Sequence, residues 1–441
     1  MHGVRAGRKG VRHGGFRHGK IRKQWLGRLL TGLVPLILPG MAMAQQAVDP
    51  RMEEDTAATR PRPEYDQPGL QAGNFLIFPT LAADLAISDN IYARRDIRVG
   101  DEVFSVRPTV WARSRWQRHE FNLHANGQVD RYVSHAGENN ETWATGFDGR
   151  IDIGKETELH GNLNFAHNIE PRGSTGDTLF GAAPVAYGLL TADLRVDQAF
   201  YHTRVTVAGH LDRFRYSPRV LNDTPIDLSY RDYDYLEGRV RVAQGVSPGM
   251  AAYAEFSIAS STYTFNLQGS GQRDATQYSG LVGVAFGLNR LIHGEAGIGY
   301  FRRDFKDPAY RGTQGLNYNV SLAWSPTRLT TVNLVAARTF QRAPMMGVAG
   351  IEEQGFTVTV VHELLRNLLL KPGGGYTRDS YQGADRHDTY ANGQFGATWL
   401  VDRHWQVDAN FTYRIGRNSD PAVAARQFDQ SRGNVTLSYR F

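Results

Sequence analysis

The segment "GNVTLSYRF" (Gly433–Phe441) decides the fold class of this 441-residue chain. Every second residue is apolar or aromatic: Val435, Leu437, Tyr439 and Phe441. The residues between them are polar: Asn434, Thr436, Ser438 and Arg440. Strict alternation with a period of two is typical of a β-strand with one apolar and one polar face. In an open sheet such a terminal strand leaves an exposed edge, whereas in a closed barrel it pairs with the first strand.

The basic charge of the chain is concentrated in its first 44 residues. They contain nine of the fifty Lys and Arg residues and no Asp or Glu. They end in an apolar run, "LLTGLVPLILPG" (Leu29–Gly40), and a small-residue site, "AMA" (Ala42–Ala44). This pattern predicts a signal peptide at 1–44, with Sec-type export and cleavage near Ala44. Without this segment forty-one basic residues face forty-four acidic ones, so the charge does not indicate nucleic-acid binding.

The rest of the chain divides into a tail and one long domain. Residues 45–70 are rich in Pro and in charged residues, which predicts a flexible periplasmic tail. Residues 71–441 are strand-like throughout and are the predicted barrel. No apolar run after residue 44 approaches the roughly 18 residues of a membrane-spanning helix. The absence of Cys excludes disulfides and thiolate metal sites.

Period-two alternation predicts eighteen strands in this domain. Their ranges are 73–88, 103–116, 118–133, 141–154, 157–170, 187–200, 203–216, 231–246, 250–264, 274–288, 291–304, 314–325, 328–341, 353–365, 368–379, 387–400, 403–416 and 427–441. Every second junction is short, such as "WQR" (Trp116–Arg118) and "VDRH" (Val401–His404). The other junctions are long and polar, such as "EPRGSTGDTLFGAAPVA" (Glu170–Ala186). Short periplasmic turns and long extracellular loops are typical of outer-membrane barrels.

These features predict an all-β fold, a transmembrane antiparallel up-and-down β-barrel of about eighteen strands, with sixteen as the alternative. We place it in the outer membrane of a Gram-negative bacterium, in contact with lipid and as a monomer. A soluble sandwich or propeller is disfavoured, since its strands would be nearer 5–6 residues long. In 118–133, Phe121 and Leu123 alternate with Asn122 and His124, so the polar face would line a wet lumen.

Sixteen charged residues take inward parity and are the predicted lumen lining. They are Glu120, Asp130, Asp148, Arg150, Asp152, Asp193, Arg195, Asp197, Arg204, Asp212, Glu237, Arg239, Arg241, Glu255, Asp408 and Arg414. Their mixed signs argue against a strongly ion-selective ring, and neighbouring opposite charges are expected to pair. Three inward aromatic residues could stack on sugar rings or fill space: Tyr132, Tyr253 and Tyr390.

Sequence motifs for catalysis, metals and cofactors are missing. Neither H-E-x-x-H nor G-x-S-x-G occurs. His124, His210 and Asp212 fall on lumen faces, but scattered polar residues are what a wet lumen requires. We therefore predict no catalytic residue, no metal ligand and no cofactor.

Two stretches resemble a known family. They are "GNFLIFPTLAADLAISDNIYA" (Gly73–Ala93) and "VRPTVWARSRWQRHEFNLHANGQVDRY" (Val106–Tyr132), and both are similar to the putative β-barrel porin 2 family. The resemblance continues as repeated hairpins over about residues 65–441. It implies an outer-membrane conduit linked to exopolysaccharide or capsule export, with no catalytic residues. The "DNIY" segment (Asp89–Tyr92) matches the family signature, and we expect it to have a structural role.

The end of the chain also resembles the C-terminal signal of outer-membrane barrels. The resemblance implies that the barrel-assembly machinery recognises Val435, Leu437, Tyr439 and Phe441. Three functions remain open: a polysaccharide export conduit, which would work with a periplasmic export apparatus, a general diffusion porin for small solutes, and a non-transporting barrel. In the last case the loop Glu170–Ala186 is the candidate plug.

Overall fold

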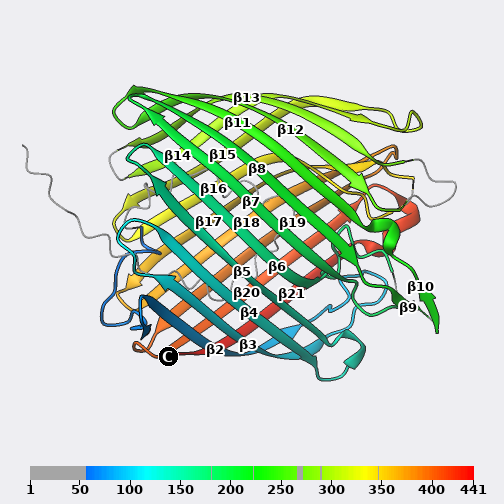
Figure 1. Ribbon diagram of the computed structural model, residues 1–441. Coiled ribbons are helices and arrows are strands. Elements are labelled where there is room, and N and C mark those ends of the chain that lie inside the picture. Colours follow the sequence, from blue (N-terminus) through cyan, green and yellow to red (C-terminus); the bar gives the residue numbers. More distant parts are fainter. Residues whose placement is uncertain (1–55, 180, 222, 266–271, 289–290, 346) are drawn as a thin grey trace, which may run out of the picture.

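Alternating apolar and polar residues set eighteen long strands edge to edge in one closed antiparallel barrel (Figure 1). The computed structural model describes residues 56–441 except 180, 222, 266–271, 289–290 and 346. The predicted signal peptide and residues 45–55 lie outside the described residues. The predicted strand number of eighteen is confirmed, and the alternative of sixteen is wrong.

The barrel strands follow one another around the wall in chain order. They are β2 (Phe75–Ser88), β3 (Asp101–Ser114), β4 (Glu120–Tyr132), β5 (Asn140–Ile153), β6 (Thr157–Ile169), β7 (Ala186–Phe200), β8 (Thr203–Tyr216), β11 (Tyr233–Ser247), β12 (Met250–Tyr263), β13 (Ala275–Leu288), β14 (Ile292–Phe305), β15 (Thr313–Thr327), β16 (Thr330–Gln341), β17 (Gly350–Leu365), β18 (Leu368–Gln382), β19 (His387–Leu400), β20 (Trp405–Asn418) and β21 (Phe428–Arg440). No predicted boundary lies more than three residues from the observed one.

The last strand pairs with the first and closes the barrel. The register between β2 and β21 runs from Thr80 opposite Arg440 to Ser88 opposite Arg432. The backbone N–H of Phe441 extends this pairing by donating to the carbonyl oxygen of Pro79, at 3.1 Å. The amphipathic strand at the end of the sequence therefore has no free edge.

Side-chain exposure shows which face of each strand points outward. On β21, Val435 and Leu437 are 54% and 46% exposed, whereas Thr436 and Ser438 are 2% and 0% exposed. The same alternation puts Phe411 of β20 on the outside and Asp408 on the inside. An apolar exterior around a polar interior is the reverse of a soluble sheet protein and is typical of an outer-membrane barrel.

The two ends of the barrel differ. Short turns and the C-terminus lie at one end, and the long loops lie at the other (Figure 1). The loops contain elements that were not predicted, namely the hairpin of β9 (Arg219–Leu221) and β10 (Thr224–Ile226) and the 3-10 helices η3 (Ala136–Glu138), η4 (Ser229–Arg231) and η5 (Pro421–Arg426). By the rule for outer-membrane barrels the turn end is periplasmic. No helix among the described residues has the length and apolarity needed to cross a membrane.

The described part of the predicted flexible tail is folded against the barrel. Residues 56–69 contain turns, and β1 (Leu70–Ala72) pairs with β2. Ala57 and Arg62 are almost fully buried. Residues 56–70 therefore make defined contacts with the barrel. Their Pro-rich and charged composition did not indicate these contacts, because the partners lie on strands that are distant in the sequence.

Candidate functional site

The inner wall of the barrel is the candidate functional surface. Strand register places all sixteen predicted charged residues on the inner face, between outward apolar neighbours such as Ile151, Leu194 and Phe256. The geometry therefore agrees with their inward parity. That they line a conducting path stays a prediction.

Most of these charges have a partner on the same wall. Arg150 contacts Asp152 and Arg195 contacts Asp197, both at 2.8 Å. A longer network connects β11, β12 and β14. On β11, Arg239 pairs with Glu237 at 2.7 Å, and it lies 3.6 Å from Glu255 on β12. Arg241 extends the network to Glu295 at 2.8 Å. Pairing removes any large ring of one sign, so the wall offers hydrogen-bonding groups more than a net charge.

Neutral polar side chains donate hydrogen bonds to other carboxylates of the predicted lumen lining. Asp408 accepts hydrogen bonds from Thr398 Oγ1, at 2.5 Å, and from Gln406 Nε2, at 2.8 Å. Asp148 accepts one from Asn122 Nδ2, at 2.8 Å. These contacts fix the carboxylates against the wall and leave a surface rich in both donors and acceptors.

The three predicted sugar-stacking tyrosines have different surroundings. The guanidinium of Arg241 lies 3.7 Å from the ring centre of Tyr253 and covers one face. The phenol end of this side chain lies against Gly283 and Gly297, where an added Cβ would come within 2.6 Å of Cζ and 2.4 Å of the hydroxyl oxygen, respectively. Tyr253 therefore packs flat on the wall, which a sequence pattern does not show. Tyr132 and Tyr390 face inward, and stacking on sugars stays a prediction for them.

The loop Glu170–Ala186, the predicted plug, lies across the loop end of the barrel. Arg172 Nη2 contacts Glu138 Oε1 at 2.6 Å, in the loop between β4 and β5. Glu170 Oε1 contacts the buried Arg231 at 2.6 Å, in the loop between β8 and β11. Burial lowers the pKa of Arg172, but its ion pairs outweigh this and raise it above the ordinary value. The guanidinium thus stays charged and holds two loops together.

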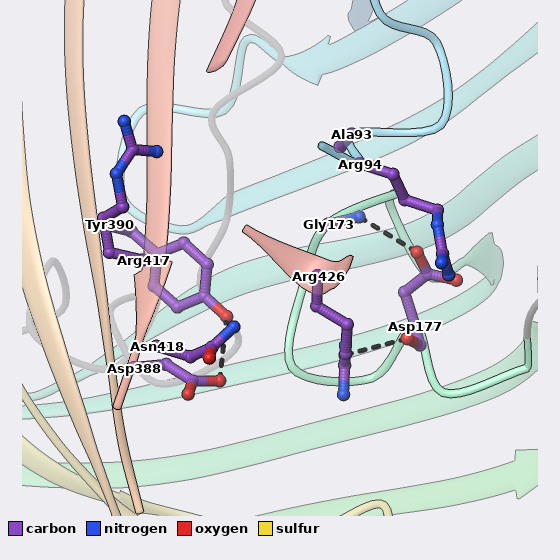
Figure 2. Close-up of a pocket in the computed structure, with 9 residues that line it drawn as sticks. All are labelled: Ala93, Arg94, Gly173, Asp177, Asp388, Tyr390, Arg417, Asn418 and Arg426. Carbon is purple, nitrogen blue, oxygen red and sulfur yellow. Dashed lines mark hydrogen bonds between the residues drawn. The ribbon is translucent and has the colours of Figure 1, made fainter. Parts of the chain in front are cut away.

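The same loop also contacts the other side of the mouth. Arg426, in η5 between β20 and β21, donates to the carbonyl oxygens of Ser174 and Asp177, at 3.1 and 2.8 Å. Figure 2 shows the small pocket that remains there, with Asp177 and Arg426 on one side and Tyr390 and Asp388 on the other. The hydroxyl of Tyr390 lies 3.5 Å from Asp388 Oδ2. The pocket therefore lies between the loop Glu170–Ala186 and the barrel wall, beside Tyr390, one of the predicted sugar-stacking residues.

The sequence analysis missed a second inward loop, which follows β16 and is described at residues 342–345 and 347–349. Its Arg342 lies in an aromatic cage formed by Tyr187, Phe214, Tyr216 and Tyr233, with 3.8 Å from the guanidinium carbon to the ring centre of Phe214. Arg342 Nη1 also donates to the Tyr233 hydroxyl, at 2.8 Å. The loop follows β16, whereas the cage belongs to β7, β8 and β11. We call loops 170–185 and 342–349 together the roof.

Residues 56–69, which we call the N-terminal segment, run along the rim of the turn end. Arg62 Nη2 and Arg60 Nη2 contact Glu363 Oε2 on β17, at 2.7 and 2.5 Å. At the other end of the segment, Gln67 Nε2 donates to the carbonyl oxygens of Pro79 and Phe441, at 2.8 and 3.2 Å. The segment therefore joins β17 to the seam between β21 and β2.

The "DNIY" segment holds this seam together at the loop end. Asp89 Oδ1 accepts from the backbone N–H of Ser431, at 2.8 Å, and Asn90 Nδ2 donates to the carbonyl oxygen of Asp429, at 3.0 Å. Burial raises the pKa of Asp89, but the Ser431 N–H and the Arg98 guanidinium outweigh this and lower it below the ordinary value. The expected structural role agrees with these contacts.

The predicted assembly signal lies on the outer face of the last strand. Tyr439 contacts the rings of Trp405 and Phe441, with centres 4.9 and 4.7 Å apart. Recognition of Val435, Leu437, Tyr439 and Phe441 by the assembly machinery stays a prediction.

The sequence analysis named no metal ligands, but the register brings Glu158, His160 and Asp197 within reach of one ion.

A comparison with family profiles agrees with this architecture. The profile of the family described as putative beta-barrel porin 2 matches residues 62–441. A search of curated protein sequences gives no match.

Solved outer-membrane proteins also match the structure, at low similarity. OpdK of Pseudomonas aeruginosa has 10% identity and a TM-score of 0.42, and the match covers 83% of this chain and 98% of that one. OpdL of Pseudomonas aeruginosa has 11% identity and a TM-score of 0.40, with 84% and 99% covered. The ferric-catecholate import receptor Fiu of E. coli K12 has 10% identity and a TM-score of 0.41, with 82% and 81% covered. These values are too low to inform function.

Proposed function

Because the chain belongs to the putative β-barrel porin 2 family over residues 62–441, we propose that it is an outer-membrane channel that exports an exopolysaccharide or capsular polymer. The observation that carries the proposal is the inner wall, whose charges are paired with one another, as Arg239 is with Glu237 and Arg241 with Glu295. Such a wall supplies hydrogen bonds to sugar hydroxyls without a single-sign ring that selects small ions. Tyr132 and Tyr390 would add aromatic faces for sugar rings.

The roof favours a conduit that is closed between transport events. It is held by non-covalent contacts, with Arg342 in its aromatic cage and Glu170 paired with Arg231. A barrel of this size that stayed open would leak small solutes, so a polymer conduit needs a removable barrier. We propose that passage of the polymer displaces loops 170–185 and 342–349.

The proposed partners follow from the two ends of the barrel. A periplasmic export apparatus would deliver the polymer at the turn end, where the N-terminal segment lines the rim through Arg62 and Glu363. The barrel would work as a monomer surrounded by outer-membrane lipid, after insertion by the barrel-assembly machinery.

A general diffusion porin for small solutes is the second candidate. The same paired charges favour it, since a polar lining of mixed sign admits small solutes of either charge. A non-transporting barrel is the third candidate, in which the roof contacts would stay closed. The three functions differ in steady conductance and in the effect of gene deletion.

The test measures secreted and cell-bound polysaccharide in a deletion strain, beside wild type and a complemented strain. We expect loss of secreted polymer on deletion and its return with the intact gene. Complementation with Ser257→Trp and Ser321→Trp on the inner wall should restore less polymer than the matched lipid-face variants Ile258→Trp and Leu322→Trp. Unchanged polymer in the deletion strain would overturn the proposal. Steady open conductance of the purified protein would then favour a diffusion porin, and its absence a non-transporting barrel.

A further inference from the structure

Three potential metal ligands meet on the inner wall near the turn end. Glu158 and His160 are two residues apart on β6 and so share one face, and Asp197 stands directly opposite Glu158 on β7. His160 Nε2 lies 3.6 Å from Glu158 Oε2 and 3.6 Å from Asp197 Oδ2. The ligand atoms of all three residues lie within 4.8 Å of one another.

No hydrogen bond to His160 Nε2 accounts for the position of this nitrogen. A separation of 3.6 Å is too long for a hydrogen bond, and His160 Nε2 is a buried atom with no hydrogen-bond partner. The nitrogen instead faces two carboxylate oxygens at equal distance. Zinc-like ions bind such atoms at about 2.0–2.2 Å, which separates neighbouring ligands by roughly 3.0–3.6 Å for angles of 90–120°.

We propose that Glu158, His160 and Asp197 form a binding site for one divalent transition-metal ion, of the class that prefers imidazole and carboxylate ligands. Imidazole ligands suit Zn²⁺, Cu²⁺ and Ni²⁺, which belong to this class. Three protein ligands leave at least one coordination position open toward the lumen for water or an anionic group. The site does not depend on the proposed cargo, since it rests on the geometry of β6 and β7.

Arg195 is the competing cation at this site. Its Nε lies 2.8 Å from Asp197 Oδ2, the same oxygen that faces His160. This contact lacks the alignment of a hydrogen bond, since Arg195 Nε has no hydrogen-bond partner. The other oxygen of Asp197 accepts from Thr206 Oγ1, at 2.5 Å, which holds the carboxylate in place. An entering ion would therefore displace the Arg195 guanidinium from Asp197 and leave the Asp197 carboxylate in position.

A second histidine on the same wall provides a matched control. His210 also stands between two carboxylates, but Asp193 lies 2.7 Å from Nδ1 and Asp212 lies 3.1 Å from Nε2. The two ring nitrogens point in different directions, so an ion on either nitrogen reaches only one of the carboxylates. We therefore expect a metal site at His160 and none at His210.

The experiment titrates Co²⁺ into the purified full-length barrel in detergent after removal of metals with a chelator. Visible absorption reports coordination, and competition with Zn²⁺ gives its affinity. We expect one site in the wild type and binding weakened by roughly tenfold or more in His160→Gln and Asp197→Asn. His210→Gln should bind as the wild type does. Arg195→Gln should bind several-fold more tightly, because the competing cation is gone.

Heat-dependent migration in gel electrophoresis shows that each variant is a folded barrel before titration. Absence of saturable binding in the wild type and in Arg195→Gln would overturn the proposal. Equal losses in His160→Gln and His210→Gln would also overturn it, since they would show non-specific binding by lumen histidines. Polysaccharide export has no part in this readout, so its failure and failure of the metal site are distinguishable.

Discussion

Replacement of Arg342 by methionine is expected to release the loop 342–349 from the barrel wall. The guanidinium carbon lies 3.8 Å from the ring centre of Phe214 and 5.1 Å from that of Tyr233, within the range of cation–π attraction. Arg342 also donates a 2.8 Å hydrogen bond to the Tyr233 hydroxyl. Methionine keeps a long apolar side chain against the rings but removes the charge and the donor.

The size of the effect follows from these contacts. A desolvated cation–π contact contributes about 2 kcal/mol. Since each 1.4 kcal/mol changes an equilibrium by about tenfold, the population with the loop released should rise by roughly thirtyfold. The hydrogen bond to Tyr233 adds to this figure, and the cost of burying the guanidinium reduces it, so we take thirtyfold as the expected order.

Hydrogen–deuterium exchange of the loop measures this population directly. Exchange of the peptide that covers 342–349 should become faster by about the same factor in Arg342→Met. The control is Arg302→Met, which removes an exposed ion pair with Asp304 and should leave the loop unchanged. Loop exchange within twofold of the wild type in Arg342→Met would refute the reasoning that the cage holds the roof.

Three further predictions concern the seam, the N-terminal segment and the lipid face. Because the pKa of Asp89 is lower in the folded than in the unfolded protein, ionised Asp89 stabilises the fold at pH values above its ordinary pKa. This stabilisation is lost as the pH falls through the pKa of the folded state. The difference in melting temperature between wild type and Asp89→Asn should therefore shrink from pH 6 to pH 3, and a constant difference would contradict this. Glu363→Gln leaves the buried Arg62 without its counter-charge, at a cost of about 3–5 kcal/mol, so trypsin should cut the N-terminal segment faster. Glu64→Gln, which removes an exposed pair, should leave that rate unchanged. Val435→Arg puts a charge on the lipid face and should destabilise the barrel by up to about 2–4 kcal/mol in urea titrations in lipid, whereas Val435→Leu should not.

The barrel itself could be predicted because its pattern is local. Alternation such as Val435, Thr436, Leu437 and Ser438 depends only on neighbouring residues, and so does the alternation of short turns and long loops. These features determined the eighteen strands, their inward and outward faces and the closing role of the last strand. The family resemblance over two N-terminal stretches is confirmed by the profile match to residues 62–441.

The candidate sites depend on partners that are distant in the sequence. Arg62 and Glu363 are 301 positions apart, and Arg342 enters a cage on strands that precede it by more than one hundred residues. The sequence analysis did not single out the "ELH" stretch (Glu158–His160), in which two potential metal ligands share one strand face. Asp197 joins them only through the register of β6 and β7.

Sequence alone therefore determined the wall of this protein, and tertiary structure decided what fills and closes it. Which strand a residue belongs to, and which way it points, follow from a period of two along the chain. Which residue it touches across the lumen follows from barrel closure, strand register and the inward path of loops 170–185 and 342–349. Those depend on all eighteen strands at once, so no local pattern contains them.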